Sequence, residues 1–296
     1  MSEQPPRTEL RDPQTEGLDL LESFALVDLL TRAQMRAVDA VLACSQHIAE
    51  TVEVAVVRLR GGGNMHYIGA GSSGRLAFLD ASECPPTFGT PRERVCAHIA
   101  GGPTALTRAV EGAEDDARAG EMEMREHVSA KDIVVGISAS GAAPYVMGAL
   151  SAARTAGAWT VAVVNNDGSK LETVAQKTIV VATGPEPLAG STRLLAGTAQ
   201  KLLLNTLSTA TMIGLGKVYD NLMIDVVATN DKLRLRSLRL VMQLTGGAEK
   251  ESAGILHEAG GRVKVAVVMA RRRVSARKAQ QLLSEHGGFL RAVLEG

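Results

Sequence analysis

The chain has 296 residues, enough to bury a substantial core as one large domain or as a main domain with an appendage. Its 32 basic and 32 acidic residues cancel and aromatic residues make up only 3%, which argues against nucleic acid as a partner. Its three cysteines lack C-x-x-C spacing, so they indicate neither a disulfide framework nor a zinc site.

Residues 1–17 are polar and proline-containing, and we expect a flexible start there. This segment has no apolar stretch before a cleavage site, and no run in the chain approaches the length that spans a bilayer. We therefore expect no membrane partner and a reducing, cytoplasmic location.

Residues 18–230 are expected to form the main domain. Helical spacing of apolar residues from Leu18 to Leu59 is followed by alternating apolar runs and helical stretches. This alternation predicts an α/β fold with a mostly parallel sheet sandwiched by helices. The predicted strands are Met65 to Gly69, Arg94 to Ile99, Asp132 to Ile137, Trp159 to Val164 and Thr178 to Val181.

The first strand leads into GAGSSGR, residues 69–75, which we interpret as a phosphate cradle. Its glycines permit a tight turn, and Ser72 and Ser73 offer hydroxyls beside a helix expected to begin near Arg75. The G-x-G-x-x-G spacing is met, but no acidic residue ends a second strand about 20 residues on, as a dinucleotide site requires. We predict no cofactor.

A second turn of this kind follows the third strand, with Ser138, Ser140 and Gly141. Taken alone, either turn could equally be an ordinary strand-to-helix connection or a phosphate-binding turn. Together they favour one phosphate site. Ser191 and Thr192 stand at the start of a long helix predicted over residues 191–216, where they are capping candidates and a third possible contact with ligand.

Two acidic positions are candidates for catalysis. Glu83 lies just before Pro85 and Pro86, and these prolines predict a rigid, non-helical backbone path. We expect the carboxylate of Glu83 to be buried in this segment. Glu111 and Glu114 would share a helical face, with one of them facing inward. Two glutamates with different surroundings can act as acid and base, although capping and solvated acidic faces are the common alternatives.

The six histidines are scattered without ligand spacing, so we predict no metal site. The sequence pattern of residues 231–296 predicts several short basic helices, which we expect to form a small C-terminal helical domain. The arginines at 271–273 are interpreted as a solvated helix end rather than a nucleic-acid contact.

Several long segments occur together in one order: GAGSSGRLAFLDASECPPTFG, GPTALTRAVEGAEDD, GISASG, GPEPLAGSTRLLAGTAQK and GKVYDNLMIDVVATNDKL. In these the chain resembles the N-acetylmuramic acid 6-phosphate etherases over nearly all of residues 18–296. The resemblance implies a sugar isomerase (SIS) domain, a small helical domain and a homodimer.

The resemblance also implies cofactor-free cleavage of a lactyl ether to N-acetylglucosamine 6-phosphate and D-lactate, in recycling of cell-wall amino sugars. Glu83 matches the acid that protonates departing lactate and later activates water, and Glu114 matches the second glutamate, the C2 base. Ser72, Ser73, Ser138 and Ser140 match the hydroxyl-rich turns around the sugar phosphate.

One position pair departs from the family pattern. Ala142 and Ala143 stand where that pattern has arginine and threonine, so a charge and a hydroxyl are missing. If the arginine contacts substrate or a second subunit, the loss weakens binding by roughly 1.5–3 kcal/mol. This departure keeps open a non-catalytic sugar-phosphate sensor that acts on a partner enzyme, and a sugar-phosphate isomerase is a third alternative.

Overall fold

A computed structural model describes residues 5–228 and 230–296. The chain packs as two compact units. The first comprises residues 1–81 and 93–208, and the second comprises residues 82–92 and 209–296.

The helices and strands of both units follow the alternation that the sequence predicts. In chain order they are η1 (Arg7–Glu9), η2 (Pro13–Thr15), η3 (Leu18–Leu20), α1 (Ser23–Ala33), α2 (Met35–Ala43), α3 (Ser45–Arg60), β1 (Met65–Gly69), α4 (Gly71–Phe88), η4 (Arg92–Arg94), β2 (Val95–Ile99), η5 (Gly102–Leu106), η6 (Ala113–Asp115), α5 (Ala117–His127), β3 (Ile133–Ser138), α6 (Pro144–Thr155), β4 (Trp159–Val164), α7 (Leu171–Val174), β5 (Lys177–Val180), α8 (Leu195–Gly214), α9 (Asp231–Thr245), α10 (Glu249–Glu258), α11 (Val263–Arg272), α12 (Ala276–Glu285) and α13 (Leu290–Glu295).

The first unit is built on a parallel sheet with strand order β2-β1-β3-β4-β5. Met65 of β1 pairs with Val95 on one side and with Ile133 on the other. The central strands β1 and β3 are buried along their whole length, as expected of a parallel sheet covered on both faces. The predicted α/β fold, with a parallel sheet between helices, is confirmed.

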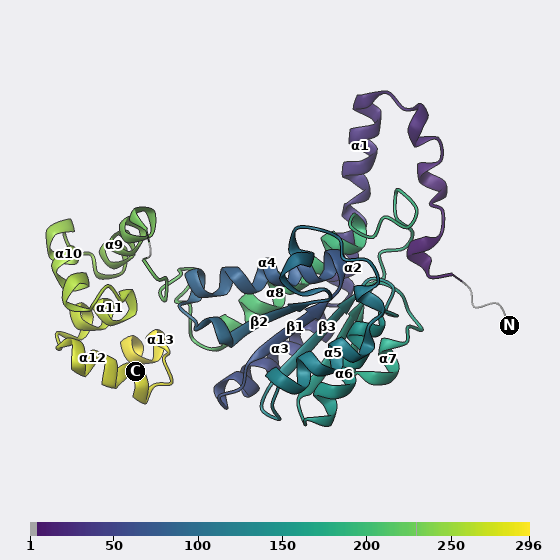
Figure 1. Ribbon diagram of the computed structural model, residues 1–296. Helices are drawn as coiled ribbons and strands as arrows, with labels where there is room; N and C mark the ends of the chain where they lie inside the picture. Colours follow the sequence, from purple (N-terminus) through teal and green to yellow (C-terminus); the bar gives the residue numbers. More distant parts are fainter. Residues whose placement is uncertain (1–4, 229) are drawn as a thin grey trace. The chain divides into compact units, whose positions relative to one another are not determined.

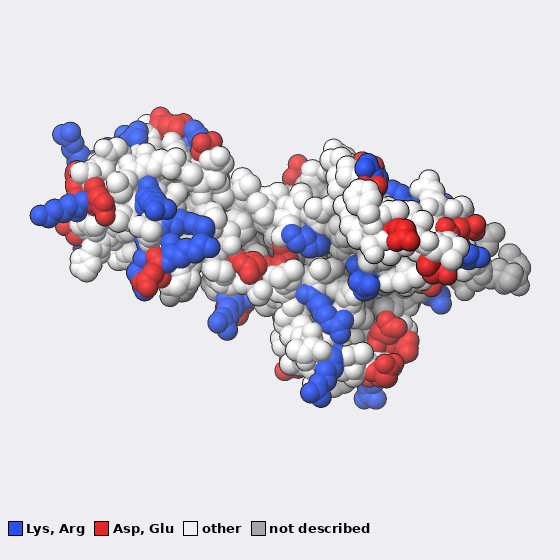
Figure 2. Space-filling model, turned by 90° about the horizontal axis from the view of Figure 1, so that it is seen from above, with Lys and Arg blue, Asp and Glu red and all other residues white. Residues whose placement is uncertain are grey.

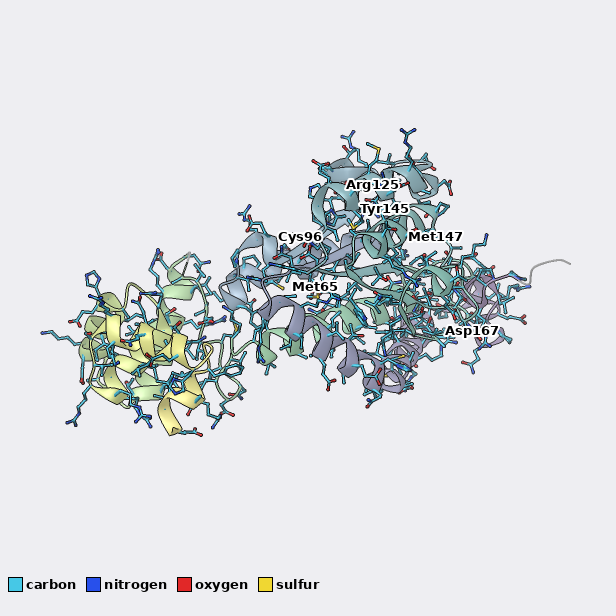
Figure 3. All side chains as sticks on the ribbon, turned by 90° about the horizontal axis from the view of Figure 1, so that it is seen from below. Met65, Cys96, Arg125, Tyr145, Met147 and Asp167 are labelled. Carbon is cyan, nitrogen blue, oxygen red and sulfur yellow. The ribbon has the colours of Figure 1, made fainter. Side chains whose placement is uncertain are left out.

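Helices cover both faces of this sheet (Figure 1). Ile68 and Val134 pack with α5, α6 and α7 on one face. On the other face the hydroxyl of Tyr67 donates to Asp80 of α4, and Ser208 of α8 donates to the same carboxylate. Met65 of β1 and Tyr145 of α6, labelled in Figure 3, are both buried in this core.

The strand order reverses between β1 and β3, because the chain leaves β1 towards β2 but leaves β3 towards β4 and β5. At such a reversal the loops after the two strands diverge, which opens a crevice at the carboxyl edge of the sheet where ligands bind. Both predicted serine turns follow these two strands.

The N-terminal segment differs from the flexible start that we expected. Residues 7–15 form two 3-10 turns. The buried Thr8 exchanges hydrogen bonds with Asn166, through its backbone N–H at 3.2 Å and its hydroxyl at 3.0 Å. Asp12 pairs with Arg36 at 2.7 Å. These contacts tie residues 7–15 to the first unit.

The second unit has its own core, in which α11 is the central helix. Residues 263–269 are all buried there, together with Val241, Leu283 and Leu290. Lys264 lies within this core and donates to Asp225 at 2.8 Å and to the carbonyl oxygen of Gly216 at 3.1 Å. The buried ammonium is thus paired and hydrogen-bonded, as a charge in a core requires.

On the face that Figure 2 shows, basic and acidic side chains are interspersed, with uncharged areas between them. Among the described residues no single helix is long and apolar enough to cross a membrane; residues 23–43 and 45–60 meet that test only as a bent pair, by length and composition.

Candidate active site

The first turn connects β1 directly to α4, which begins at Gly71 rather than near Arg75. Gly71 has a φ of +52°, and a Cβ on Gly74 would lie 2.5 Å from the side chain of Ile99. A Cβ on Gly69 would lie 2.8 Å from the backbone nitrogen of Gly74. The glycines therefore let the helix begin against the ends of β1 and β2, as the sequence predicted.

The two serines of this turn have different surroundings. Ser73 is buried and donates to Gln200 of α8 at 2.8 Å. Gln200 in turn donates to Asn165, just after β4, at 2.9 Å. Ser72 is half-buried and lines a pocket at the surface. Ser73 thus stabilises the first turn through a buried hydrogen bond, whereas Ser72 lines a surface pocket.

The second turn begins at the end of β3. The hydroxyl of Ser138 accepts from the backbone N–H of Gly141 at 3.1 Å, and that of Ser140 accepts from the N–H of Ala142 at 3.3 Å. Gly141 has a φ of +69°, and a Cβ there would lie 2.3 Å from Cβ of Ser169. The turn therefore requires glycine. It places both hydroxyls at the carboxyl edge of the sheet.

Ala143 is the N-cap of α6 and provides no side-chain cap before Pro144. A threonine hydroxyl there would accept from an amide in the first turn of the helix. We expect Ala143→Thr to raise the free energy of unfolding by about 0.5–2 kcal/mol, measured by chemical denaturation. Ala143→Val, which adds the same shape without the hydroxyl, is the control. An equal gain in both variants would contradict the capping explanation.

Glu83 lies near the end of α4, and both sequence expectations for its surroundings are wrong. The helix continues through Pro85 and Pro86 to Phe88, and the side chain of Glu83 is exposed. The fixed φ of proline is compatible with a helix, but each proline removes one hydrogen bond to the residue four positions earlier and crowds that residue's carbonyl group. The carboxylate of Glu83 is therefore open to solvent.

Glu114 lies in the short helix η6, which follows Gly112 at a φ of +72°. This left-handed residue separates Glu111 from Glu114, so the two do not share a helical face. Both are exposed, and the expectation that one faces inward is wrong. Glu114 is held by the loop between β2 and α5.

The N-terminus of α8 is capped by a residue that the sequence did not single out. The helix begins at Leu195, and the buried carboxylate of Glu186 accepts from the backbone N–H groups of Leu195 and Ala196 at 2.7 and 2.9 Å. Burial raises the pKa of Glu186, and the two backbone hydrogen bonds oppose this rise. These two amides are thus capped by Glu186 and not by Ser191 or Thr192, which are half-buried just before the helix.

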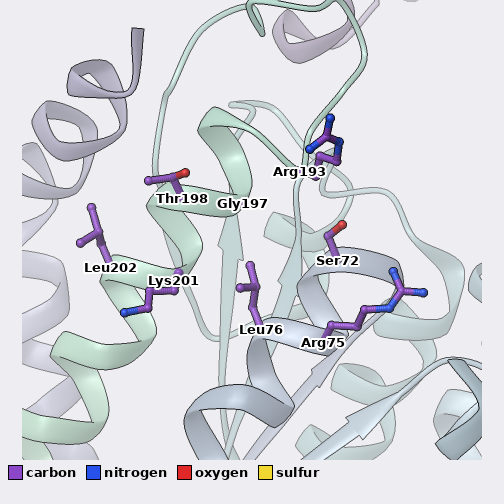
Figure 4. A pocket seen from close by; sticks show the side chains of 8 residues that line it. All are labelled: Ser72, Arg75, Leu76, Arg193, Gly197, Thr198, Lys201 and Leu202. Carbon is purple, nitrogen blue, oxygen red and sulfur yellow. The ribbon is translucent and has the colours of Figure 1, made fainter. Parts of the chain in front are cut away.

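A pocket of about 410 Å³ lies between the first turns of α4 and α8 (Figure 4). Its lining combines aliphatic side chains with three cationic ones, Arg75, Arg193 and Lys201. The other lining residues are Ser72, Leu76, Gly197, Thr198 and Leu202. Arg75 donates through Nε to the carbonyl oxygen of Ala105 at 3.0 Å. The pocket brings Arg193 and Lys201 beside Ser72.

Asp80 is a buried acid with two hydroxyl donors, Tyr67 and Ser208, each at 3.0 Å. Burial raises the pKa of Asp80 to about 6, despite the lowering effect of these hydrogen bonds. The folded state keeps the proton up to about pH 6, whereas the unfolded chain releases it near pH 4. The contribution of Asp80 to stability is therefore full below pH 4 and is lost as the pH rises through 6.

We expect this loss to be about 3 kcal/mol of the free energy of unfolding between pH 4 and 7. In Asp80→Asn that part of the pH dependence disappears, as measured by denaturant unfolding at several pH values. Asp115→Asn, at an exposed carboxylate, serves as the control. A slope in Asp80→Asn equal to that of wild type would contradict this assignment.

Three of the histidines that look scattered in the sequence meet on one face of the sheet. Nδ1 of His66 lies 3.1 Å from Nε2 of His98, whose Nδ1 lies 2.7 Å from Glu123. His127 packs edge-on against His98. Burial lowers the pKa of His66 to about 4, so its ring is neutral at pH 7. Within residues 5–228 and 230–296 no group of three His, Cys, Asp or Glu side chains is arranged to hold a metal ion.

Known proteins match most of this chain. The model of the glucokinase regulatory protein N-terminal SIS domain matches residues 47–154. A phosphoheptose isomerase structure from Francisella tularensis superposes with a TM-score of 0.50 at 18% identity, over 65% of this chain and 100% of that one. At that identity the likeness supports the fold alone.

The sequence relatives are much closer. An N-acetylmuramic acid 6-phosphate etherase from Serratia proteamaculans is 47% identical over 288 residues, which cover 97% of each chain. Another, from Yersinia pestis, is 47% identical over 288 residues, covering 97% of this chain and 98% of that one. With this identity along nearly its whole length, the chain belongs to the N-acetylmuramic acid 6-phosphate etherase family.

Proposed function

We propose that the protein is an enzyme that cleaves the D-lactyl ether of N-acetylmuramic acid 6-phosphate, giving N-acetylglucosamine 6-phosphate and D-lactate. The observation that carries this proposal is the 47% identity over 97% of the chain to etherases of that name. Glu83, Glu114 and both serine turns lie within the matched segments. The proposed setting is amino-sugar recycling in the cytoplasm, by a homodimer.

The chemistry needs two carboxyl groups. In the open-chain sugar the C1 aldehyde acidifies the proton at C2, and Glu114 is proposed to take it. The electron pair forms a C2–C3 double bond as the C3–O bond breaks, and Glu83 is proposed to protonate the departing lactate oxygen. Glu83 then takes a proton from water, which adds to C3, and C2 is reprotonated. Both side chains are exposed and thus accessible to substrate.

The serine turns are proposed to bind the sugar phosphate. Ser138 and Ser140 lie in the turn before α6, and Ser72 lies in the first turn of α4, so each turn adds hydroxyls to a helix N-terminus. Their strands flank the reversal of the strand order. Gly141, Ser191 and Thr192 complete the proposed substrate-binding set.

A second candidate is a sugar-phosphate sensor without catalysis. It is favoured by Ala142 and Ala143, which replace an arginine and a threonine of the family pattern, and by the match to the SIS domain of a regulatory protein. The retained glutamates at 83 and 114 favour the enzyme.

Incubation of the purified protein with N-acetylmuramic acid 6-phosphate distinguishes the two. The enzyme should release D-lactate and N-acetylglucosamine 6-phosphate in equal amounts, measured by a lactate dehydrogenase assay and by mass spectrometry. Substrate that remains intact while it raises the melting temperature would instead identify a sensor.

A further inference from the structure

The N-terminal helices expose an apolar surface that their own chain does not cover. Of the fifteen exposed large apolar side chains in the described residues, six lie between residues 20 and 42. Helix α1 buries none of its eleven residues. Leu20, Phe24 and Val27 are 83%, 86% and 62% exposed. Phe24 and Val27 are three residues apart in α1 and so lie on one face of that helix, whereas Leu20 precedes them at the end of η3. We call these three exposed side chains the apolar stripe.

The pocket between α4 and α8 has an apolar wall and a positively charged rim, which complement the apolar side chains and nearby carboxylates of the N-terminal segment. Leu76 and Leu202 form apolar parts of its wall, and the aliphatic stems of Arg193 and Lys201 extend this wall to a cationic rim. Figure 4 shows Leu76 pointing into the space between the two helices. An aromatic side chain with carboxylates near it therefore suits the aliphatic wall and the cationic rim of this pocket.

The charges of the two surfaces are also complementary. Glu16, Asp19 and Glu22 are exposed next to the apolar stripe, and none of the three forms an ion pair with a described residue. Among the same residues Arg193 and Lys201 have no acidic partner within 4.0 Å. Contact between the two surfaces would bring opposite charges together at a partly desolvated rim.

A hydrogen bond links the base of α1 to the same pocket. Thr198, in the pocket wall, donates to Gln34 at the end of α1 at 2.8 Å. Phe24 lies ten residues earlier, so the helical rise places it about 15 Å from Gln34. Because α1 leads away from the sheet (Figure 1), its tip does not reach the pocket at its own base. In a dimer with twofold symmetry, the apolar side chains of each copy can contact the pocket of the other copy.

We propose that Phe24 of one copy enters the pocket between α4 and α8 of a second copy, and that the second copy returns the same contact. This rests on the homodimer of the proposed function and adds the surface that builds it. Phe24 of one copy then lies against Leu76 and Leu202 of the other, on the apolar part of the pocket wall.

Light scattering after size exclusion tests the contact. The chain has a mass of 31.1 kDa, and we expect wild type at twice that mass and Phe24→Asp at a single chain mass. Leu235→Asp, at a position 48% exposed on α9, should remain a dimer. Since α1 buries none of its residues, Phe24→Asp should keep the circular dichroism and thermal unfolding of the folded chain.

Disulfide cross-linking between two cysteine variants tests whether Phe24 binds in the pocket of the second copy. The single variants Phe24→Cys and Leu202→Cys are each oxidised alone and then as a mixture. We expect a new disulfide-linked dimer only in the mixture, because the bond joins two copies. A mixture that forms no such dimer, or a dimeric Phe24→Asp, would overturn the proposal.

A membrane is the competing partner for this surface, because residues 23–43 and 45–60 pass a length and composition test as a bent pair. A monomeric wild type that sediments with phosphatidylcholine vesicles through Phe24 would also overturn the dimer contact. Release of D-lactate by wild type is measured separately, so failure of the contact is distinguishable from failure of the proposed function.

Discussion

Glu83→Gln should lower kcat for D-lactate release by about 100- to 10,000-fold, the usual contribution of a general acid or base. Glutamine keeps the shape of the side chain but does not deliver a proton to the departing lactate oxygen. Because Glu83 is exposed, the variant should fold like wild type. The rate is measured with a coupled lactate dehydrogenase assay under saturating substrate.

Glu114→Gln should lose a similar factor for a different reason, and deuterium exchange separates the two roles. In deuterated water Glu83→Gln should still exchange the C2 proton of the substrate without releasing lactate, whereas Glu114→Gln should do neither. Glu111→Gln is the matched control, because Glu111 is exposed in the same loop. Full activity in both Glu83→Gln and Glu114→Gln would refute the proposed mechanism.

Glu186→Ala should lower the free energy of unfolding by about 2–5 kcal/mol, because two buried backbone amides lose their acceptor. The affected amides belong to Leu195 and Ala196 at the start of α8. Glu186→Gln retains one acceptor oxygen, so its loss should be smaller. Denaturant unfolding of the three proteins gives the comparison.

Glu172→Ala is the control for that series. Its carboxylate accepts from the backbone N–H of Ser169 at 2.7 Å, just before the short helix α7, but the side chain is exposed. Water can replace an exposed acceptor, so this substitution should cost about 1 kcal/mol or less. Equal losses in Glu186→Ala and Glu172→Ala would show that burial of the cap is not what matters.

The strands were predictable from the sequence because each is a short, largely apolar run between helical stretches. The predicted Arg94 to Ile99 and Thr178 to Val181 each lie within one residue of the observed β2 and β5. The helix boundaries were less accessible. Helix α4 passes through two prolines, since packing of the rest of the helix outweighs the hydrogen bonds that the prolines remove.

The sequence predicted the two serine turns of the candidate site, but it did not predict the tertiary contacts that hold the site together. Ser138 and Gly141 are only three positions apart in the chain, so the sequence alone indicates a turn there. Glu186 and the start of α8, or His66 and His98, come together only through the tertiary fold. Exposure of Glu83 is likewise a property of the folded chain.

The most direct test of the proposed activity is turnover of N-acetylmuramic acid 6-phosphate in water labelled with oxygen-18. Elimination and readdition predict unlabelled D-lactate and one labelled oxygen at C3 of N-acetylglucosamine 6-phosphate, read by mass spectrometry. Label in the lactate and none in the sugar would show attack on the lactyl carbon instead, and would contradict the roles assigned to Glu83 and Glu114.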